Sequence, residues 1–394
     1  MPTPSYRAWL GFSKDTVNTT LSAAVAASAV TVPIVGTGVA ANSTITIIDG
    51  PLTESRAVTA GGGTSSLTVA ALTNAHSAGA YVTAQLTASL GAVDYLPCMF
   101  TPTDTQAQLK DKGYRGSAAI EFGNVAGVRS FSGTITGDVF PDTFGYLVGG
   151  VTGAVDFAGG TPNVHTFALK NTGDTQPTPF VGWMFIPSEA QARVMAGLKV
   201  EELTINYDPS ALLTYSAKVQ SWASGVGPAP AGTAPTYSSV TPGYSWGVQA
   251  SIGGSNVAYV SKATITIRRP ATPVFTLQNL PDPYKIWSGP QDVSGSLEMV
   301  FEDATQYNNF MNNSQPATKL TFTPAGANPN VITVQMTKCN FETFGHVLND
   351  ASGYVKANLN FRALANTTDA NTAGTGYAPV RVAVSNSKAS GSFQ

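Results

Sequence analysis

The chain has 394 residues, of which 43% are hydrophobic and only 11% are charged, and its formal net charge is −2 at pH 7. This hydrophobic content excludes a disordered chain, which would combine low hydrophobicity with high charge. The length favours two or three structural units, and the lack of any run of Lys or Arg argues against a protein that grips nucleic-acid phosphates.

The N-terminal segment, residues 1–16, is predicted to be an arm anchored by Trp9, Leu10 and Phe12. The uncharged stretch 21–41 follows it closely. This stretch is dominated by Ala and interrupted by Pro and Gly, so it predicts neither a signal peptide nor a membrane span. We therefore expect a soluble protein that does not associate with a membrane.

Residues 17–90 are predicted to form a small self-contained β module. Short runs rich in β-branched residues alternate there with Gly-, Asp- and Asn-rich turns, a pattern typical of compact β structure. In the run STITIID, Ile45 and Ile47 alternate with Thr44 and Thr46, so one buried face is expected. The other predicted strands of the module lie at 31–35, 55–60, 65–70 and 81–86.

Two large β units are predicted to follow, at residues 91–222 and 244–365. A Pro/Gly-rich linker separates them at 223–243, and residues 366–394 are predicted to be a C-terminal arm with one strand-like stretch at 379–385. Alternating side chains identify the inward faces of four strands. These inward residues are Leu203, Ile205 and Tyr207; Leu213, Tyr215, Ala217 and Val219; Ile265 and Ile267; and Val355, Ala357, Leu359 and Phe361.

The two large units repeat the same order of elements. The segments 132–142 (SGTITGDVFPD) and 294–303 (SGSLEMVFED) both run from Ser-Gly through an alternating strand to an Asp. Asp142 and Asp303 are each expected to cap a short helix. In both units a strand follows that helix, then a penultimate strand, then a closing strand with clear alternation. The order predicts an internal duplication, with chance similarity between β-rich segments as the alternative.

No set of residues in the sequence predicts a catalytic or metal site. His76, His165 and His346 lie in different predicted elements, and Cys98 and Cys339 have no metal-ligand spacing. Adjacent carboxylates occur as Glu201–Glu202 and Glu302–Asp303, but neighbouring strand residues point to opposite faces and do not converge as an acid–base pair. We therefore expect no enzyme activity, no catalytic residues, no cofactor and no metal.

Several motifs resemble those of siphophage major tail tube proteins, of the type found in phages of actinobacteria. The resemblance covers about residues 1–16 and 92–390. In this family an arm like that at 1–16 usually leads directly into a strand like that at 95–100, so we interpret residues 17–90 as an inserted or decorating module. The most specific motifs are GYRGS (113–117), FPDTFGYL (140–147), IWSGPQDVSG (286–295) and NFRALANTTDA (360–370).

The resemblance implies a mainly β fold with two tandem tail-tube-type β-sandwich or barrel domains, each flanked by a short helix. It implies a structural virion protein, assembled in the host bacterial cytoplasm, that polymerises into stacked rings. These rings form the hollow non-contractile tail tube through which phage DNA is ejected into the host. The implied partners are further copies of the chain, the tape measure protein, and the tail terminator and distal tail proteins, while double-stranded DNA passes without specific binding.

The duplication predicts the symmetry of the ring. If one chain supplies two tube folds, a trimer presents six in a pseudo-sixfold ring, and a true hexamer is the alternative. The 17–90 module is expected on the tube exterior, because inside it would narrow the channel. A secreted or surface β-rich adhesion or carbohydrate-binding protein is the alternative function, although the sequence has no evident signal peptide to support it.

Overall fold

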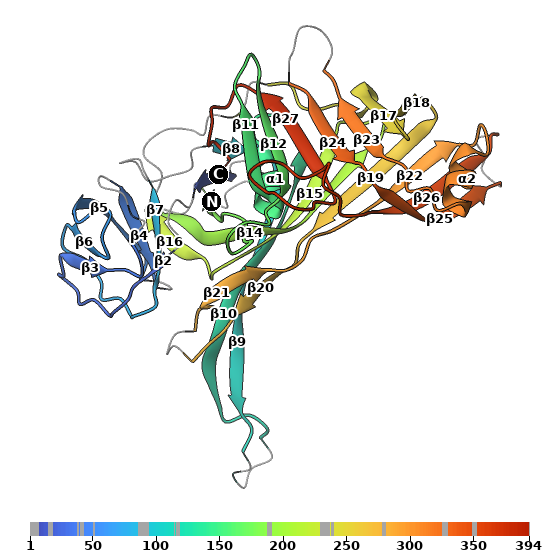
Figure 1. Ribbon diagram of the computed structural model, residues 1–394. Coiled ribbons are helices and arrows are strands. Elements are labelled where there is room, and N and C mark those ends of the chain that lie inside the picture. Colours follow the sequence, from blue (N-terminus) through green and yellow to red (C-terminus); the bar gives the residue numbers. More distant parts are fainter. Residues whose placement is uncertain are drawn as a thin grey trace.

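The computed structural model describes residues 8–14, 19–37, 39, 43–49, 52–85, 94–113, 115, 119–186, 191–228, 237, 240–277, 281–324, 330–348 and 353–393. Parts of the predicted N-terminal arm and of the predicted linker lie outside these residues. The protein is mainly β, as predicted: the described part of the chain forms three large antiparallel sheets and two α-helices (Figure 1).

The largest sheet contains strands from both halves of the chain. Backbone pairing orders eight of its described strands as β9, β10, β15, β14, β19, β22, β26 and β25, all antiparallel. The two halves therefore meet at β14 and β19 within one continuous sheet. The strand bounds are Met99–Asp111 (β9), Gly123–Asp138 (β10), Thr214–Ser221 (β15), Gln191–Tyr207 (β14), Val260–Arg268 (β19), Asp292–Val300 (β22), Lys356–Ala363 (β26) and Cys339–Val347 (β25).

The N-terminal part of β14 extends this sheet in another direction. There it pairs with β16 (Gly225–Pro228) and β13 (Phe180–Phe185), and β13 continues through β1 (Trp9–Lys14) to β8 (Asp94–Leu96). The predicted arm thus contains an internal strand. Leu10 and Phe12 are buried as expected, because alternate residues of β1 point into the core.

The second sheet joins the two halves through the C-terminal segment. Its order is β11, β12, β27, β24, β23, β17 and β18. The segment predicted as a C-terminal arm contains β27, which pairs on one side with β12 and on the other with β24. The bounds are Gly153–Ala158 (β11), Asn163–Leu169 (β12), Arg381–Asn386 (β27), Ile332–Met336 (β24), Thr318–Phe322 (β23), Val248–Ile252 (β17) and Ser255–Val257 (β18).

One hydrophobic core lies between these two sheets, and helix α1 (Phe144–Thr152) is buried in it. Helix α2 (Thr305–Met311) lies at the far end of the large sheet, beside β25 (Figure 1). The predicted inward residues are buried, with one exception. Val355 is 36% exposed because it precedes β26, so the inward alternation begins only at Ala357.

The predicted helix caps are wrong in detail. The residue before α1 is Thr143 and the residue before α2 is Ala304, and neither makes a side-chain capping bond. Each Asp lies one position too early to be the N-cap. The carboxylate of Asp303 still accepts the backbone N–H of Thr305 at 2.7 Å, whereas Oδ1 of Asp142 is buried without a hydrogen bond to any described residue.

The third sheet forms the N-terminal module and has its own hydrophobic core. Ile45 and Ile47 are buried there as expected, but Thr44 and Thr46 are buried too. The single buried face was therefore wrong: β4 is covered on both sides, and the Thr46 and Ser55 hydroxyls lie 2.8 Å apart. In sheet order the strands are β2 (Thr19–Thr20), β7 (Tyr81–Gln85), β4 (Thr44–Ile48), β5 (Glu54–Ala60), β6 (Ser66–Val69) and β3 (Thr31–Pro33).

The module is attached to the large sheet by an apolar contact. Tyr81 stacks on Trp222 with ring centroids 4.4 Å apart, and Trp183 of β13 belongs to the same cluster. Gly197 of β14 has φ +60°, and a Cβ there would lie 2.2 Å from the Trp222 ring. Glycine is needed at this position on both grounds. The hairpin β20 (Ala271–Val274) and β21 (Lys285–Ser288) contributes Ala271 and Ile286 to the same cluster.

Candidate functional site

The three histidines lie in unrelated surroundings. Nε2 of His165 lies 3.1 Å from the carbonyl oxygen of Lys388, and the His346 ring meets Phe301 edge-on with centroids 4.5 Å apart. His76 lies in the N-terminal module. In the described ranges no group of three or more His, Cys, Asp or Glu residues could hold a metal ion. The structure therefore does not bring the histidines together.

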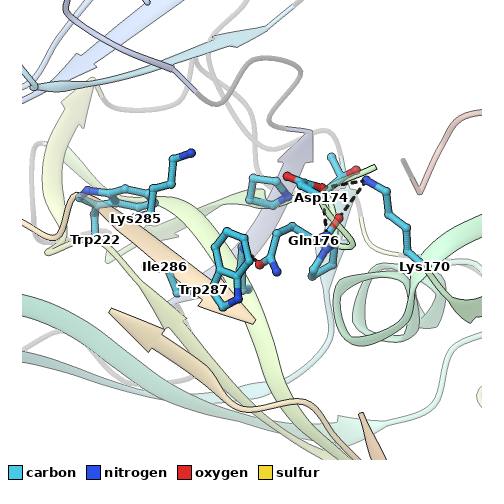
Figure 2. Close-up of a pocket in the computed structure, with 11 residues that line it drawn as sticks. Lys170, Asp174, Gln176, Trp222, Lys285, Ile286 and Trp287 are labelled. Atoms are coloured by element: carbon cyan, nitrogen blue, oxygen red, sulfur yellow. Dashed lines mark hydrogen bonds and ion pairs between the residues drawn. The ribbon is translucent and has the colours of Figure 1, made fainter. Parts of the chain in front are cut away.

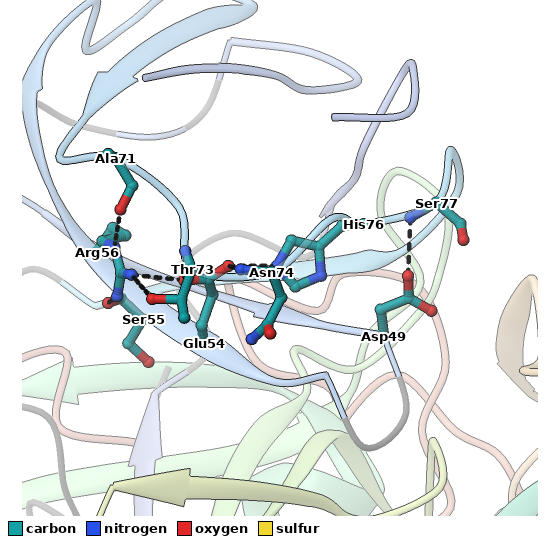
Figure 3. A network of polar contacts seen from close by, with 9 residues as sticks. All are labelled: Asp49, Glu54, Ser55, Arg56, Ala71, Thr73, Asn74, His76 and Ser77. Carbon is teal, nitrogen blue, oxygen red and sulfur yellow. Dashed lines mark hydrogen bonds and ion pairs between the residues drawn. The ribbon is translucent and has the colours of Figure 1, made fainter. Parts of the chain in front are cut away.

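His76 belongs to a polar network that fixes a loop of the module (Figure 3). The Glu54 carboxylate accepts the backbone N–H groups of Thr73 and Asn74 at 2.8 and 3.0 Å, and it lies 2.7 Å from both His76 Nε2 and Arg56. Burial alone would raise the pKa of Glu54, but these bonds outweigh it and the pKa is lowered. The carboxylate holds the loop against β5, which is a structural role.

The cysteines and the paired carboxylates are also separate. Cys98 and Cys339 are free thiols, and burial raises the pKa of Cys98 to about 12 and that of Cys339 to about 11. Their thiolate populations at neutral pH are therefore very small. Glu202 lies on the solvent face of β14 and pairs with Lys218 at 2.8 Å, so it does not converge with its neighbour Glu201.

A positively charged pocket of about 300 Å³ lies between the loop after β12, the hairpin β20–β21 and β14 (Figure 2). Lys199 in its wall is only 4% exposed, and its ammonium donates to Gln176 Oε1 at 2.8 Å. Burial, together with nearby Arg269, lowers the pKa of Lys199 to about 8. Lys170 and Lys285 line the same pocket. The arrangement is energetically costly, because burial disfavours a charged ammonium.

A broad polar surface is formed by the side of the large sheet turned away from the core, which we name the open face. Most of its side chains are polar, with the exposed Met99 of β9 as an apolar exception, and they line up across both halves in register. The hydroxyls of Thr204 and Thr266 lie 3.0 Å apart across the β14–β19 junction, and Thr264 Oγ1 donates to Asn206 at 3.3 Å. Further members in the same rows are Thr134, Thr136, Thr214, Ser216, Ser294, Ser296, Asn358, Asn360 and Thr343.

The charged residues of the open face neutralise one another. One row reads Lys218, Glu202, Arg268 and Asp292 across β15, β14, β19 and β22, so its signs alternate. Glu202 lies 2.8 Å from Lys218 and 3.8 Å from Arg268. The remaining pairs of the face, within 4 Å, are Lys262–Asp208, Lys356–Glu298, Arg362–Asp292 and Arg362–Glu342.

Hydrogen bonding to Lys262 lowers the pKa of Asp208 below its usual range, so this pair stays ionised at neutral pH. Every Lys and Arg named on the face thus has a carboxylate within 4 Å. The face offers hydroxyls, amides and compensated charges. Such a surface can be hydrated along its whole width without holding a polyanion, because phosphate binding needs uncompensated cations.

The alternation within single strands predicted their outward residues but not the open face that these residues form together. The alternation in each strand supplied a signal, since the outward positions hold Thr, Ser, Asn and paired charges. The missing information was strand order, which the sequence does not encode locally. The buried Lys199 had no such signal.

Comparison with known proteins assigns the family. Among the described residues, neither helix is long and apolar enough to cross a bilayer. No curated protein matches the chain. The family model of the phage tail tube protein matches residues 88–363, which is most of the chain and includes both halves of the large sheet. The chain therefore belongs to the phage tail tube protein family.

Proposed function

We propose that this tail tube protein forms closed rings that stack into a hollow tube, with the open face turned towards the lumen, and that phage DNA passes through this lumen into the host. The observation that carries the proposal is the composition of the open face. A conduit for DNA must stay wetted, and it must not bind phosphates, since each bound phosphate slows passage. A continuous sheet of hydroxyls, amides and paired charges meets both requirements.

The width of the sheet supports three chains per ring. With eight described strands per chain, a trimer supplies about 24 strands spaced about 4.8 Å apart. At a tilt of about 40°, such a barrel is roughly 48 Å wide between backbones. Six chains would give roughly 96 Å by the same geometry, much wider than a conduit for one duplex requires. We therefore favour a trimer with pseudo-sixfold symmetry over a hexamer.

Stacking of the rings is supported by the hairpin β9–β10, which projects beyond the large sheet (Figure 1). Arg129 at its base donates two hydrogen bonds of 2.6 Å to the Asp282 carboxylate. Leu109, Ile120 and Val125 near its tip are largely exposed. An isolated two-stranded hairpin is marginal in water, so we propose that the next ring covers these side chains.

The proposal includes a division of the chain into two tail-tube units, a linker and a decorating module. We propose tail-tube units at 91–222 and 244–365, joined by the linker 223–243, and a decorating module at 17–90 outside the tube. The module packs against the part of β14 that carries Gly197, whereas the polar rows begin at Glu202. The protein acts as a structural component without enzymatic activity, with the tape measure, tail terminator and distal tail proteins as further partners.

Electron cryo-microscopy of tubes grown from the purified chain tests the ring. We expect hollow tubes with three chains per ring and the open face lining the lumen. Rings of six chains contradict the trimer, and tubes with the open face outside contradict the assignment of the lumen. A monodisperse chain that never polymerises contradicts the tube itself.

Thiol labelling of assembled tubes tests the position of the module. Ser65 is exposed in the loop between β5 and β6, so Ser65→Cys is expected to react with a thiol reagent too large to enter the lumen. Ser216→Cys on the open face is the matched control and should stay protected. Equal protection of both positions contradicts an external module.

A further inference from the structure

The two halves of the large sheet share one irregularity, although the shifts in the β9–β10 and β19–β22 pairings lie at different positions. In β14 the pairing with β15 shifts between Val200 and Glu202, and in β25 the pairing with β26 shifts between Phe341 and Thr343. These two bulges are equivalent, because β10 and β22 align at their Ser-Gly motifs and pair in the same way with β15 and β26. Strand β14 therefore corresponds to β25, and β9 corresponds to β19.

In the described residues, β14 pairs with β19, but the equivalent strands β25 and β9 do not pair with each other. Inside the chain β14 pairs with β19, with Thr204 opposite Thr266 and Tyr207 opposite Ala263. Their equivalents, β25 and β9, pair only with β26 and β10 in the described part of the chain. Among the described residues, each thus presents a free backbone edge at an opposite end of the same sheet. Unpaired edges of this kind pair readily with another chain.

The equivalent apolar side chains at the ends of β14 and β25 differ in exposure. Tyr207, at the end of β14, is 7% exposed and packs beside Val260 and Ala263 of β19. The bulge register makes Leu348 the equivalent of Tyr207, and Leu348 is 74% exposed. A large apolar side chain that is buried in one half is therefore left in solvent in the other.

The matching recess lies at the opposite end of the sheet. The residue that corresponds to Ala263 is Phe100, and Phe100 lines a groove of about 940 Å³ together with nearby Cys98. At the internal junction the residual cavity is only about 50 Å³. Leu10 and Met184 contribute to the groove wall, so its lining suits an apolar side chain.

We propose that β25 of one copy pairs with β9 of the next in the register of β14 on β19, and that Leu348 fills the groove beside Cys98 and Phe100 of that next copy. This inference rests on the proposed ring and specifies its seam. The expected register places Gly345 opposite Thr103 and Thr343 opposite Thr105 of the neighbouring copy. The occupant of the groove is thus a second copy of this chain.

Disulfide trapping tests the register. The double variant Gly345→Cys/Thr103→Cys should link neighbouring copies in oxidised tubes, and the linked products should end at three chains. Thr343→Cys/Thr101→Cys is the matched control, because these positions are four residues out of register and lie beyond disulfide reach. The native thiols contribute little at pH 8, since burial raises their pKa values to about 12 and 11. Linking of the control pair in preference to the first overturns the register.

Substitution of Leu348 tests the groove contact. Leu348→Ala is expected to raise the critical concentration for assembly by about ten- to a hundredfold, as removal of one buried leucine predicts, and Leu348→Asp should abolish assembly. Because Leu348 is exposed in the single chain, both variants should unfold in urea as the wild type does. Leu277→Asp, at another exposed leucine, is the control and should assemble normally.

Normal assembly of Leu348→Asp overturns the seam while leaving the proposed function intact. By contrast, a wild-type chain that forms no tubes overturns the proposed function itself. Tubes that form normally but resist trapping at positions 345 and 103 also contradict the seam. The two failures are thus distinguishable in the same set of preparations.

Discussion

The two halves of the large sheet share a chain path but differ in what covers them. Every residue of α1 is buried, whereas α2 buries only Gln306 among its residues. The sequence of α1, FGYLVGGVT, is apolar on all sides, as a helix inside a core requires, whereas TQYNNFM in α2 is amphipathic. Phe393 closes the first half, with its ring centroid 5.1 Å from that of Tyr146.

A second difference lies at the matching bulges. One residue ahead of the pairing shift, the first half has the buried Lys199 and the second half has the half-buried Asn340. Together these differences show that backbone register can persist in a repeat while the surroundings of equivalent side chains diverge. The chain itself covers α1 of the first half, whereas each half keeps one sheet edge, β9 or β25, that a neighbour is proposed to cover.

Truncation of one apolar side chain in each helix should give the largest difference in the free energy of unfolding. Leu147→Ala in α1 should lower the free energy of unfolding by about 2–5 kcal/mol, because it leaves a cavity at a fully buried site. Met311→Ala in α2, where the side chain is 60% exposed, should change it by less than about 0.5 kcal/mol. Urea unfolding of the unassembled chain measures both. Similar costs for the two variants would contradict the contrast between the helices.

The residues beside the two bulges should differ in how they make the unfolding free energy depend on pH, and this difference is smaller. Lys199 has a folded-state pKa of about 8, below the value of about 10.4 for an unfolded chain. Its burial therefore penalises the folded state below pH 8, and the penalty fades as pH rises towards 10. Between pH 7.5 and 10, the unfolding free energy of the wild type should gain about 1–3 kcal/mol relative to Lys199→Met.

Asn340→Met is the control for this measurement at the equivalent position of the second half. Because Asn340 does not titrate, the difference between this variant and the wild type should stay constant over the same pH range. A pH-independent difference for Lys199→Met as well would show that the buried ammonium is not the source.

The smallest effect concerns the open face. Glu202 pairs with Lys218 and Arg268 in the first half, whereas Thr343 occupies the matching position in the second. Glu202→Gln should lower the unfolding free energy by less than about 1 kcal/mol, because surface ion pairs contribute little. The loss should shrink further in high salt, where exposed charges are screened. Urea unfolding at low and high salt measures it, and a larger or salt-independent loss would indicate a different role for Glu202.

The sequence predicted the local structure well and the assembly of strands poorly. The alternation of Leu213, Tyr215 and Ala217 identified an inward face because strand geometry is local. The central position of the strand around Val382 in the second sheet was not predicted, since a strand in a terminal arm and a central strand have the same local pattern. For the same reason the open face, which needs strand order, did not emerge from the residues alone. The helix positions were anticipated, but their caps were displaced by one residue.

Strand β27 has a consequence for the order of events during protein synthesis. It lies between β12 and β24, and Asn386 pairs with Asn163, so the second sheet closes only after residues up to Asn386 have left the ribosome. Contacts this distant in sequence form slowly. A nascent chain that has not reached β27 therefore lacks the strand that joins its halves in the second sheet. The complete second sheet can therefore form only after β27 has been synthesised.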